Sequence, residues 1–104
     1  IELPYTAQIG LGVIIEHQHG IVIHGNVVIG NNCIIRQGVT IGNRYMDRLT
    51  EAPVIGNNVN IGAGAKLLGN ITIGDNVNIG ANAVVVHDVP QNGLYVGFPK
   101  NIKA

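Results

Sequence analysis

Two histidines lie in the short segment from Glu16 to Gly20, which reads Glu-His-Gln-His-Gly. The pKa of an imidazole lies near neutrality, so His17 could take the proton from a hydroxyl that attacks an activated acyl group. Such a base needs an acidic or carbonyl partner that fixes its tautomer. Glu16 should point away from His17 in a regular strand, whereas Glu2 could reach it. We therefore predict His17 as the general base and Glu2 as its partner.

The elements that position these residues follow from an aliphatic residue that recurs every six positions. This spacing fits neither a heptad nor an amphipathic helix. It slips by two residues at the histidine segment and is broken again between Asn43 and Pro53. Such breaks are where functional residues are expected. The repeated positions are Ile9, Ile15, Ile23, Ile29, Ile35, Ile41, Ile55, Ile61, Leu67, Ile73, Ile79 and Val85.

The six-residue repeat predicts an all-β fold, a single-stranded parallel β-helix of about four triangular coils. The coils should begin at Ile9, Ile29, Ile55 and Ile73, with a protruding loop between residues 43 and 53. Small or β-branched residues four positions after each aliphatic one suit a tightly filled interior. The tail from Asp88 onward is predicted to leave the coil. The alternative, an antiparallel sandwich of short strands, does not explain a strict period of six.

In each coil, the second face should end in a residue that points toward a corner. In successive coils these residues should stack in one column. The repeat places His17, Gln37, Ala63 and Ala81 in that column. The two alanines leave the backbone bare, at about 10 and 14 Å from the histidine if coils stack at the ordinary strand spacing. A thioester on a thin pantetheine arm could lie along this groove, where backbone N–H and C=O groups would meet its amides.

The composition narrows the class of protein. The chain has 104 residues, of which 15 are glycine, and a net charge of zero. We expect one domain over residues 1–104, taken from a longer chain, and a homo-oligomer, because few charges cover its surface. Neither a nucleic-acid footprint nor a membrane span is indicated. A single cysteine, Cys33, cannot form an internal disulfide and fits a cytoplasmic location.

The stretches "IGLGVIIEHQHGIVIHGN", "IGAGAKLLGNITIG" and "GFPKNI" together resemble the catalytic domain of serine acetyltransferases and of their capsule- and exopolysaccharide-linked relatives. The resemblance implies a left-handed coil, a homotrimer with active sites between subunits, and direct acetyl transfer from acetyl-CoA. It implies His17 and Glu2 as catalytic residues. The CoA-lining turns of the family match Ala63 and Ala81.

Further candidates surround this core set. We predict Glu16, His19 and Arg44 as acceptor-binding residues, and Gly42, Lys66 and Lys100 as residues that meet CoA, since ammonium groups pair well with phosphates. For each lysine, a solvated surface position is an equally good interpretation. Arg44 could equally belong to a plain flexible loop.

The chain departs from the serine enzymes just before Pro53. The family places an Arg-His pair there to help hold the amino acid, whereas this chain has Glu51-Ala52. An acid and a methyl group should repel a carboxylate rather than bind it. We therefore prefer a sugar hydroxyl of a surface polysaccharide as acceptor, with L-serine as the second possibility.

Two other classes of protein remain open. His19 and His24 have a spacing like that of γ-class carbonic anhydrases, although a third histidine one coil away is missing and His87 is too far along the chain. We expect no metal. A noncatalytic β-helix scaffold is the other alternative; an ice-binding surface would need threonines in one column, which this chain lacks.

Overall fold

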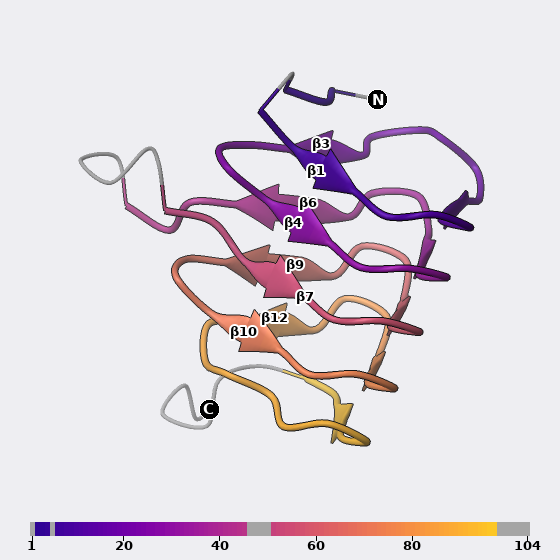
Figure 1. Cartoon of the computed structure of the whole chain (residues 1–104), viewed down its shortest axis with the longest axis vertical. Coiled ribbons are helices and arrows are strands. Elements are labelled where there is room, and N and C mark those ends of the chain that lie inside the picture. The colour runs from indigo at the N-terminus through magenta and orange to yellow at the C-terminus, as the bar shows by residue number, and fades with distance from the viewer. Residues whose placement is uncertain (1, 5, 46–50, 98–104) are drawn as a thin grey trace.

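The computed structural model describes residues 2–4, 6–45 and 51–97, and it confirms the predicted all-β parallel helix. The chain winds through three flat faces in turn, so that successive coils stack as a triangular prism with the N-terminus at one end (Figure 1). Every strand pairing among the described residues is parallel, which excludes the antiparallel sandwich.

The strands are two or three residues long because each face of the prism is crossed in six residues, including the corner. One sheet contains β1 (Gln8–Ile9), β4 (Val28–Ile29), β7 (Val54–Ile55) and β10 (Thr72–Ile73). The second contains β2 (Ile14–Ile15), β5 (Ile34–Ile35), β8 (Asn60–Ile61), β11 (Asn78–Ile79) and β13 (Leu94–Tyr95). The third contains β3 (Val22–Ile23), β6 (Thr40–Gly42), β9 (Lys66–Leu68) and β12 (Val84–Val85).

The predicted register is confirmed along each sheet. Ile15 pairs with Ile35 and Ile35 with Ile61, so the repeated aliphatic residues stack inward in columns. The four predicted coil starts fall on β1, β4, β7 and β10. From the second coil onward these inward residues are almost completely buried, whereas Ile9 is 37% exposed because it lies in the first coil. Close-packed aliphatic columns of this kind supply most of the stabilisation of such a fold.

The corner between the first and second sheets is built by Asn and Asp side chains, and we call it the asparagine corner (residues 11–12, 31–32, 57–58, 75–76 and 91–92). The Asn57 side-chain oxygen accepts the Asn31 N–H at 2.8 Å, and the Asp75 carboxylate accepts the Asn57 N–H at 2.7 Å. The next residue in each coil, such as Asn58 with φ of 58°, has a left-handed backbone that asparagine tolerates. Each coil is thus hydrogen-bonded to its neighbour at this corner.

The prediction that the chain leaves the coil at Asp88 is wrong. Val89 forms a parallel bridge with Ile73, and β13 pairs with β11, so a partial fifth coil continues to Gly97. The six-residue pattern is hidden there because Val89 follows Val85 by four residues instead of six, although Tyr95 follows Val89 by six and the backbone still stacks. The middle of the loop after β6, residues 46–50, and the C-terminal residues 98–104 lie outside the described residues.

Candidate active site

The corner between the second and third sheets carries the predicted base, and we call its first coil, residues 16–20, the histidine bulge. On one side of the bulge the Glu16 N–H donates to the Ile35 carbonyl at 2.9 Å; on the other, the His19 carbonyl accepts the Gly38 N–H at 2.8 Å. Within the described chain, the N–H groups of His17 and Gln18 donate no hydrogen bond to the coil below. The bulge therefore projects two extra residues from an otherwise closed ladder.

The backbone of His17 is left-handed, with φ of 56°. In the described part of the chain, every other residue with a positive φ is a glycine or an asparagine. A left-handed conformation costs a histidine about 1 kcal/mol or more, and it persists only where the surrounding structure imposes it. Residues held in this way cluster at functional sites. The backbone of His17 therefore marks it as a candidate functional residue among the described residues.

The alignment predicted for His17 needs a correction. The corner hydrogen bonds place Gln37 above Ala63, because the Gly64 N–H donates to the Gln37 carbonyl at 2.9 Å. The equivalent carbonyl in the first coil belongs to His19, since it accepts from Gly38. His19 therefore continues the column of Gln37 and Ala63, and His17 lies two residues before it along the chain. The two extra residues of the bulge cause this shift.

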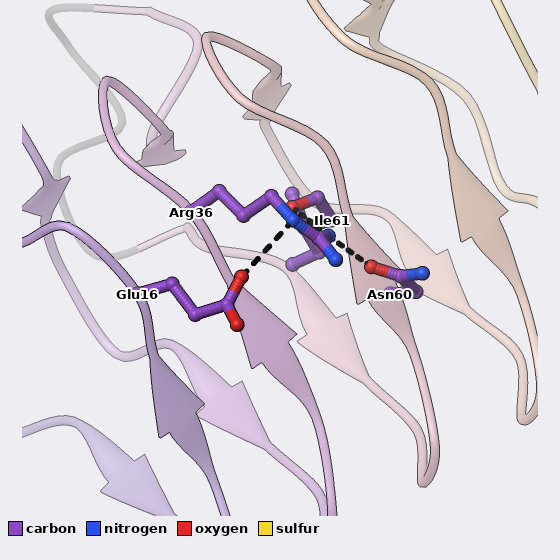
Figure 2. A network of polar contacts seen from close by, with 4 residues as sticks. All are labelled: Glu16, Arg36, Asn60 and Ile61. Atoms are coloured by element: carbon purple, nitrogen blue, oxygen red, sulfur yellow. Dashed lines mark hydrogen bonds and ion pairs between the residues drawn. The ribbon is translucent and has the colours of Figure 1, made fainter.

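An ion pair fastens the bulge to the coils below it. The Glu16 carboxylate lies 3.3 Å from Nε of Arg36, and the same guanidinium donates through Nη1 to the Asn60 side-chain oxygen and, at 3.4 Å, to the Ile61 carbonyl (Figure 2). Because Glu16, Arg36 and Asn60 come from successive coils, this network joins three coils on the outer side of the second sheet. Glu16 was predicted to bind the acceptor, and the structure shows that its charge is already partnered.

Glu2 lies one coil above the third sheet. It forms a parallel bridge with Val22, in which the Glu2 N–H donates to the Ile21 carbonyl and the Glu2 carbonyl accepts the Ile23 N–H, both at 2.9 Å. Its carboxylate forms neither a hydrogen bond nor an ion pair with His17 among the described contacts of this single chain. The pairing of these two residues stays a prediction.

Two of the residues predicted to line CoA, Ala63 and Ala81, share one edge of the prism. Ala63 and Ala81 occupy the same corner in adjacent coils, where the Asn82 N–H donates to the Ala63 carbonyl at 2.8 Å. Lys66 begins β9 just beyond this corner, and its exposed ammonium lies 3.4 Å from the Gly64 carbonyl. Gly42 ends β6 on the third sheet, and a β-carbon there would lie 2.9 Å from Cβ of His24, so His24 covers it.

Arg44 lies away from the histidine bulge within one chain. Its guanidinium stacks over the Tyr45 ring at 5.2 Å, and its Cβ lies 3.3 Å from the position of a β-carbon on Gly69. Gly69 belongs to the corner between the third and first sheets, whereas His17 belongs to the corner before the third sheet. Lys100 falls outside the described residues.

Cys33 is buried in the core, and its thiol donates to the Gly56 carbonyl at 3.2 Å. Burial raises the pKa of this thiol, and hydrogen bonds from backbone groups near Asn58 and Val59 only partly oppose the effect. A neutral, inaccessible thiol is a poor nucleophile. Within the described ranges, no group of three or more His, Cys, Asp or Glu side chains could hold a metal ion, and no helix could cross a membrane.

Arg36 is the site residue that the sequence analysis missed. The register that pairs Ile15 with Ile35 also sets Glu16 directly above Arg36, so two opposite charges follow two stacked isoleucines. Opposite charges that face each other across neighbouring strands attract one another. This signal was present in the repeat and could have predicted the pair.

Comparison with known proteins agrees with this architecture. The sequence family described as "Bacterial transferase hexapeptide (six repeats)" matches residues 52–87. The chain is 51% identical to a serine acetyltransferase of Staphylococcus xylosus over 102 residues. These residues cover 98% of this chain and 47% of that protein. It is 47% identical over 102 residues to the putative colanic acid biosynthesis acetyltransferase WcaB of Escherichia coli strain K12, spanning 98% of this chain and 62% of WcaB.

Among solved structures, the soybean serine acetyltransferase apoenzyme superimposes with a TM-score of 0.85 at 44% identity, over 90% of this chain and 39% of the soybean chain. The left-handed winding expected from the resemblance is confirmed by this likeness. The chain therefore resembles serine acetyltransferases and WcaB along almost its whole length, but it spans only about half the length of these relatives.

Proposed function

We propose that this chain is the catalytic β-helix of an acetyl-CoA-dependent O-acetyltransferase that works in the cytoplasm as a homotrimer. The observation that supports this most is the histidine bulge, where an exposed imidazole is held on a left-handed backbone at the edge shared with Ala63 and Ala81. The relatives named as acetyltransferases cover this entire region of the chain.

In this proposal His17 acts as the general base. Its neutral imidazole takes the proton of the acceptor hydroxyl while the hydroxyl oxygen attacks the thioester carbonyl of acetyl-CoA. The carbon–sulfur bond then breaks, and the imidazolium returns the proton to the departing thiolate. The products are an acetyl ester and free CoA. Glu2 orients the imidazole, and no acyl-enzyme forms, in keeping with the burial of Cys33.

The pantetheine arm would run along the edge that carries Ala63 and Ala81. Methyl side chains keep this edge low, so an extended ligand can approach the backbone of the stacked coils. Lys66, exposed just beyond the corner, would meet a phosphate of CoA. Gly42, which lies on the third sheet with Lys66, would contact CoA as well. Lys100 is proposed for a second phosphate from the sequence alone.

A second subunit would complete the site. Glu16, His17 and His19 are all exposed on one chain, so a single copy leaves the base open to water. Large apolar side chains are also exposed, among them Leu11 at 81%, Ile14 at 52% and Val54 at 45%. Surfaces of this kind are usually covered in an assembly. Arg44, distant from His17 of its own chain, would then bind the acceptor at a neighbour's site.

We propose a sugar hydroxyl of a surface polysaccharide as the acceptor. Glu51 and Ala52 stand at the positions where the serine enzymes would supply cationic and imidazole groups, and a carboxylate there disfavours an anionic acceptor. The likeness to WcaB supports this choice. L-serine is the second candidate, favoured by the equally close likeness to serine acetyltransferases.

The test is a transfer assay that follows release of free CoA thiol from acetyl-CoA with L-serine and with a panel of nucleotide sugars and oligosaccharides. We expect acetyl ester formation on a sugar, and loss of turnover with retained CoA binding in His17→Ala. Normal turnover by His17→Ala would refute the mechanism. Preference for L-serine would refute the acceptor alone.

A further inference from the structure

We propose that Arg36 is a positioning residue for catalysis, which holds the histidine bulge in its left-handed conformation through Glu16. This inference rests on the proposed role of His17 as the base. It assigns a catalytic contribution to a residue on the outer side of the second sheet, one coil below the bulge and outside the predicted set of site residues (Figure 2).

The backbone alone does not hold the bulge. The last ladder bond before it is the Glu16 N–H to the Ile35 carbonyl, and the ladder resumes only at the His19 carbonyl. His17 lies between these points with φ of 56°. A non-glycine residue stays in such a conformation only when contacts on its flanks fix the chain. On the side of the second sheet, the side-chain contact that does this is the Glu16–Arg36 ion pair.

Arg36 is itself immobilised, so it can act as a fixed anchor. Its guanidinium is held by the Asn60 side chain and the Ile61 carbonyl in the third coil, and it is 31% exposed. A planar guanidinium that bonds three oxygens at once keeps one orientation, as a flexible ammonium does not. Arg36 thereby fixes the position of Glu16, and hence of His17, relative to the rigid coils below.

Arg36 also neutralises the carboxylate nearest in sequence to the base. The charged groups around His17 are Glu16, Arg36 and Glu2, with His19 as a further titratable group on the bulge. The ion pair therefore leaves no unpaired carboxylate on this flank of the bulge.

The experiment compares Arg36→Gln and Arg36→Lys with a matched control, Asn78→Ala. Asn78 follows Asn60 on the same sheet, is exposed, and makes no side-chain hydrogen bond in the described chain. We expect Arg36→Gln to lower kcat roughly tenfold to a hundredfold, the range for a displacement of up to about 1 Å, with little change in KM for acetyl-CoA. Arg36→Lys keeps the charge but lacks the planar fork, so it should restore only part of the lost kcat. Asn78→Ala should keep the original kcat.

Two further variants separate the possible outcomes. If Arg36→Gln does not fold, Glu16→Gln tests the same pair, and it should lower kcat with little change in KM for acetyl-CoA. The double variant Arg36→Gln/Glu16→Gln should be no slower than the slower single variant, because both remove one interaction. Folded Arg36→Gln and Glu16→Gln proteins with the kcat of Asn78→Ala would overturn the inference. An active His17→Ala would instead overturn the proposed function.

Discussion

The asparagine corner and the histidine bulge solve the same geometrical problem in opposite ways. At the asparagine corner, the chain turns with a left-handed asparagine, and side-chain oxygens such as Oδ1 of Asn57 accept the backbone N–H of the coil above. At the bulge, a left-handed histidine stands where the ladder is open, and an ion pair from an adjacent face secures it. The first corner is closed by its own residues, and the second depends on Arg36.

Within the same repeat, one corner therefore serves stability and the other serves catalysis. The regular corner leaves few free polar groups and repeats in every coil, so it stabilises the stack. The bulge occurs once, exposes an imidazole and leaves two backbone N–H groups without a partner in the coil below. Local departures from a consistent pattern are expected where function requires them. The predictions below alter the bulge, the stack beneath it, the asparagine corner and the core between the two corners.

The largest effect is expected when the bulge is removed. Deletion of His17 and Gln18 leaves Glu16-His19-Gly20, which matches the regular corner Arg36-Gln37-Gly38. Because general-base catalysis contributes about 10²- to 10⁴-fold, turnover should fall by at least the lower of these factors. The melting temperature should not fall, since the strained residue is gone. A thermal melt beside the thiol-release assay checks both; an active deletion variant would contradict the separation.

Adding a methyl group between the coils beneath the bulge should lower stability rather than turnover. A β-carbon on Gly62 would lie 2.6 Å from the Ala81 backbone nitrogen, which cannot move without separating the coils. We expect Gly62→Ala to lower the free energy of unfolding by about 1–3 kcal/mol, as overpacking does. Chemical denaturation measures this loss. Gly97→Ala, where φ is 82° and no atom lies within 4 Å of a β-carbon, measures instead the cost of backbone strain without overpacking. A Gly62→Ala protein as stable as the original chain would refute the steric explanation.

A smaller loss is expected at the asparagine corner. Asn57→Ala removes the oxygen that accepts the Asn31 N–H, which should lower the free energy of unfolding by about 1 kcal/mol. Turnover per folded molecule should be unchanged, because this corner lies on a different edge from His17. Denaturation and the transfer assay together check this prediction. A loss of turnover greater than the loss of folded protein would show that the two corners are coupled.

The smallest effect concerns the core between the two corners. Burial raises the pKa of Cys33 above that of a free thiol, so the unfolded chain loses this proton at a lower pH than the folded chain does. The contribution of Cys33 to stability is thus complete below about pH 8.5 and falls as the pH rises beyond it. Denaturation at pH 8 and pH 10 should show a smaller pH-dependent loss in Cys33→Ala than in the original chain. The opposite sign would exclude a raised pKa.

The sequence predicted the regular part of the molecule well because the repeat is over-determined. Ile15, Ile35 and Ile61 carry the same period and the same inward direction, so fold class, register and coil starts all followed from spacing. The fifth coil was missed because the corner between Val85 and Val89 is two residues shorter than the repeat, while the backbone continues to stack.

The candidate site was less predictable for a physical reason. A two-residue insertion shows in the spacing, but the spacing does not say which two residues leave the ladder. The Gly38–His19 hydrogen bond decides this, and it places His19 rather than His17 in line with Gln37. Likewise, the pairing of Arg36 with Glu16 depends on side-chain reach as well as on register.

The most direct measurement is the steady-state rate of acetyl transfer by His17→Asn. Asparagine tolerates the left-handed backbone at φ of 56°, as Asn32, Asn58 and Asn76 do here, but it cannot accept a proton near neutral pH. The variant should keep the melting temperature and the affinity for CoA, with kcat lowered by about 10²- to 10⁴-fold. A His17→Asn protein that transfers acetyl at the original rate would contradict the account, because the bulge would then serve shape alone.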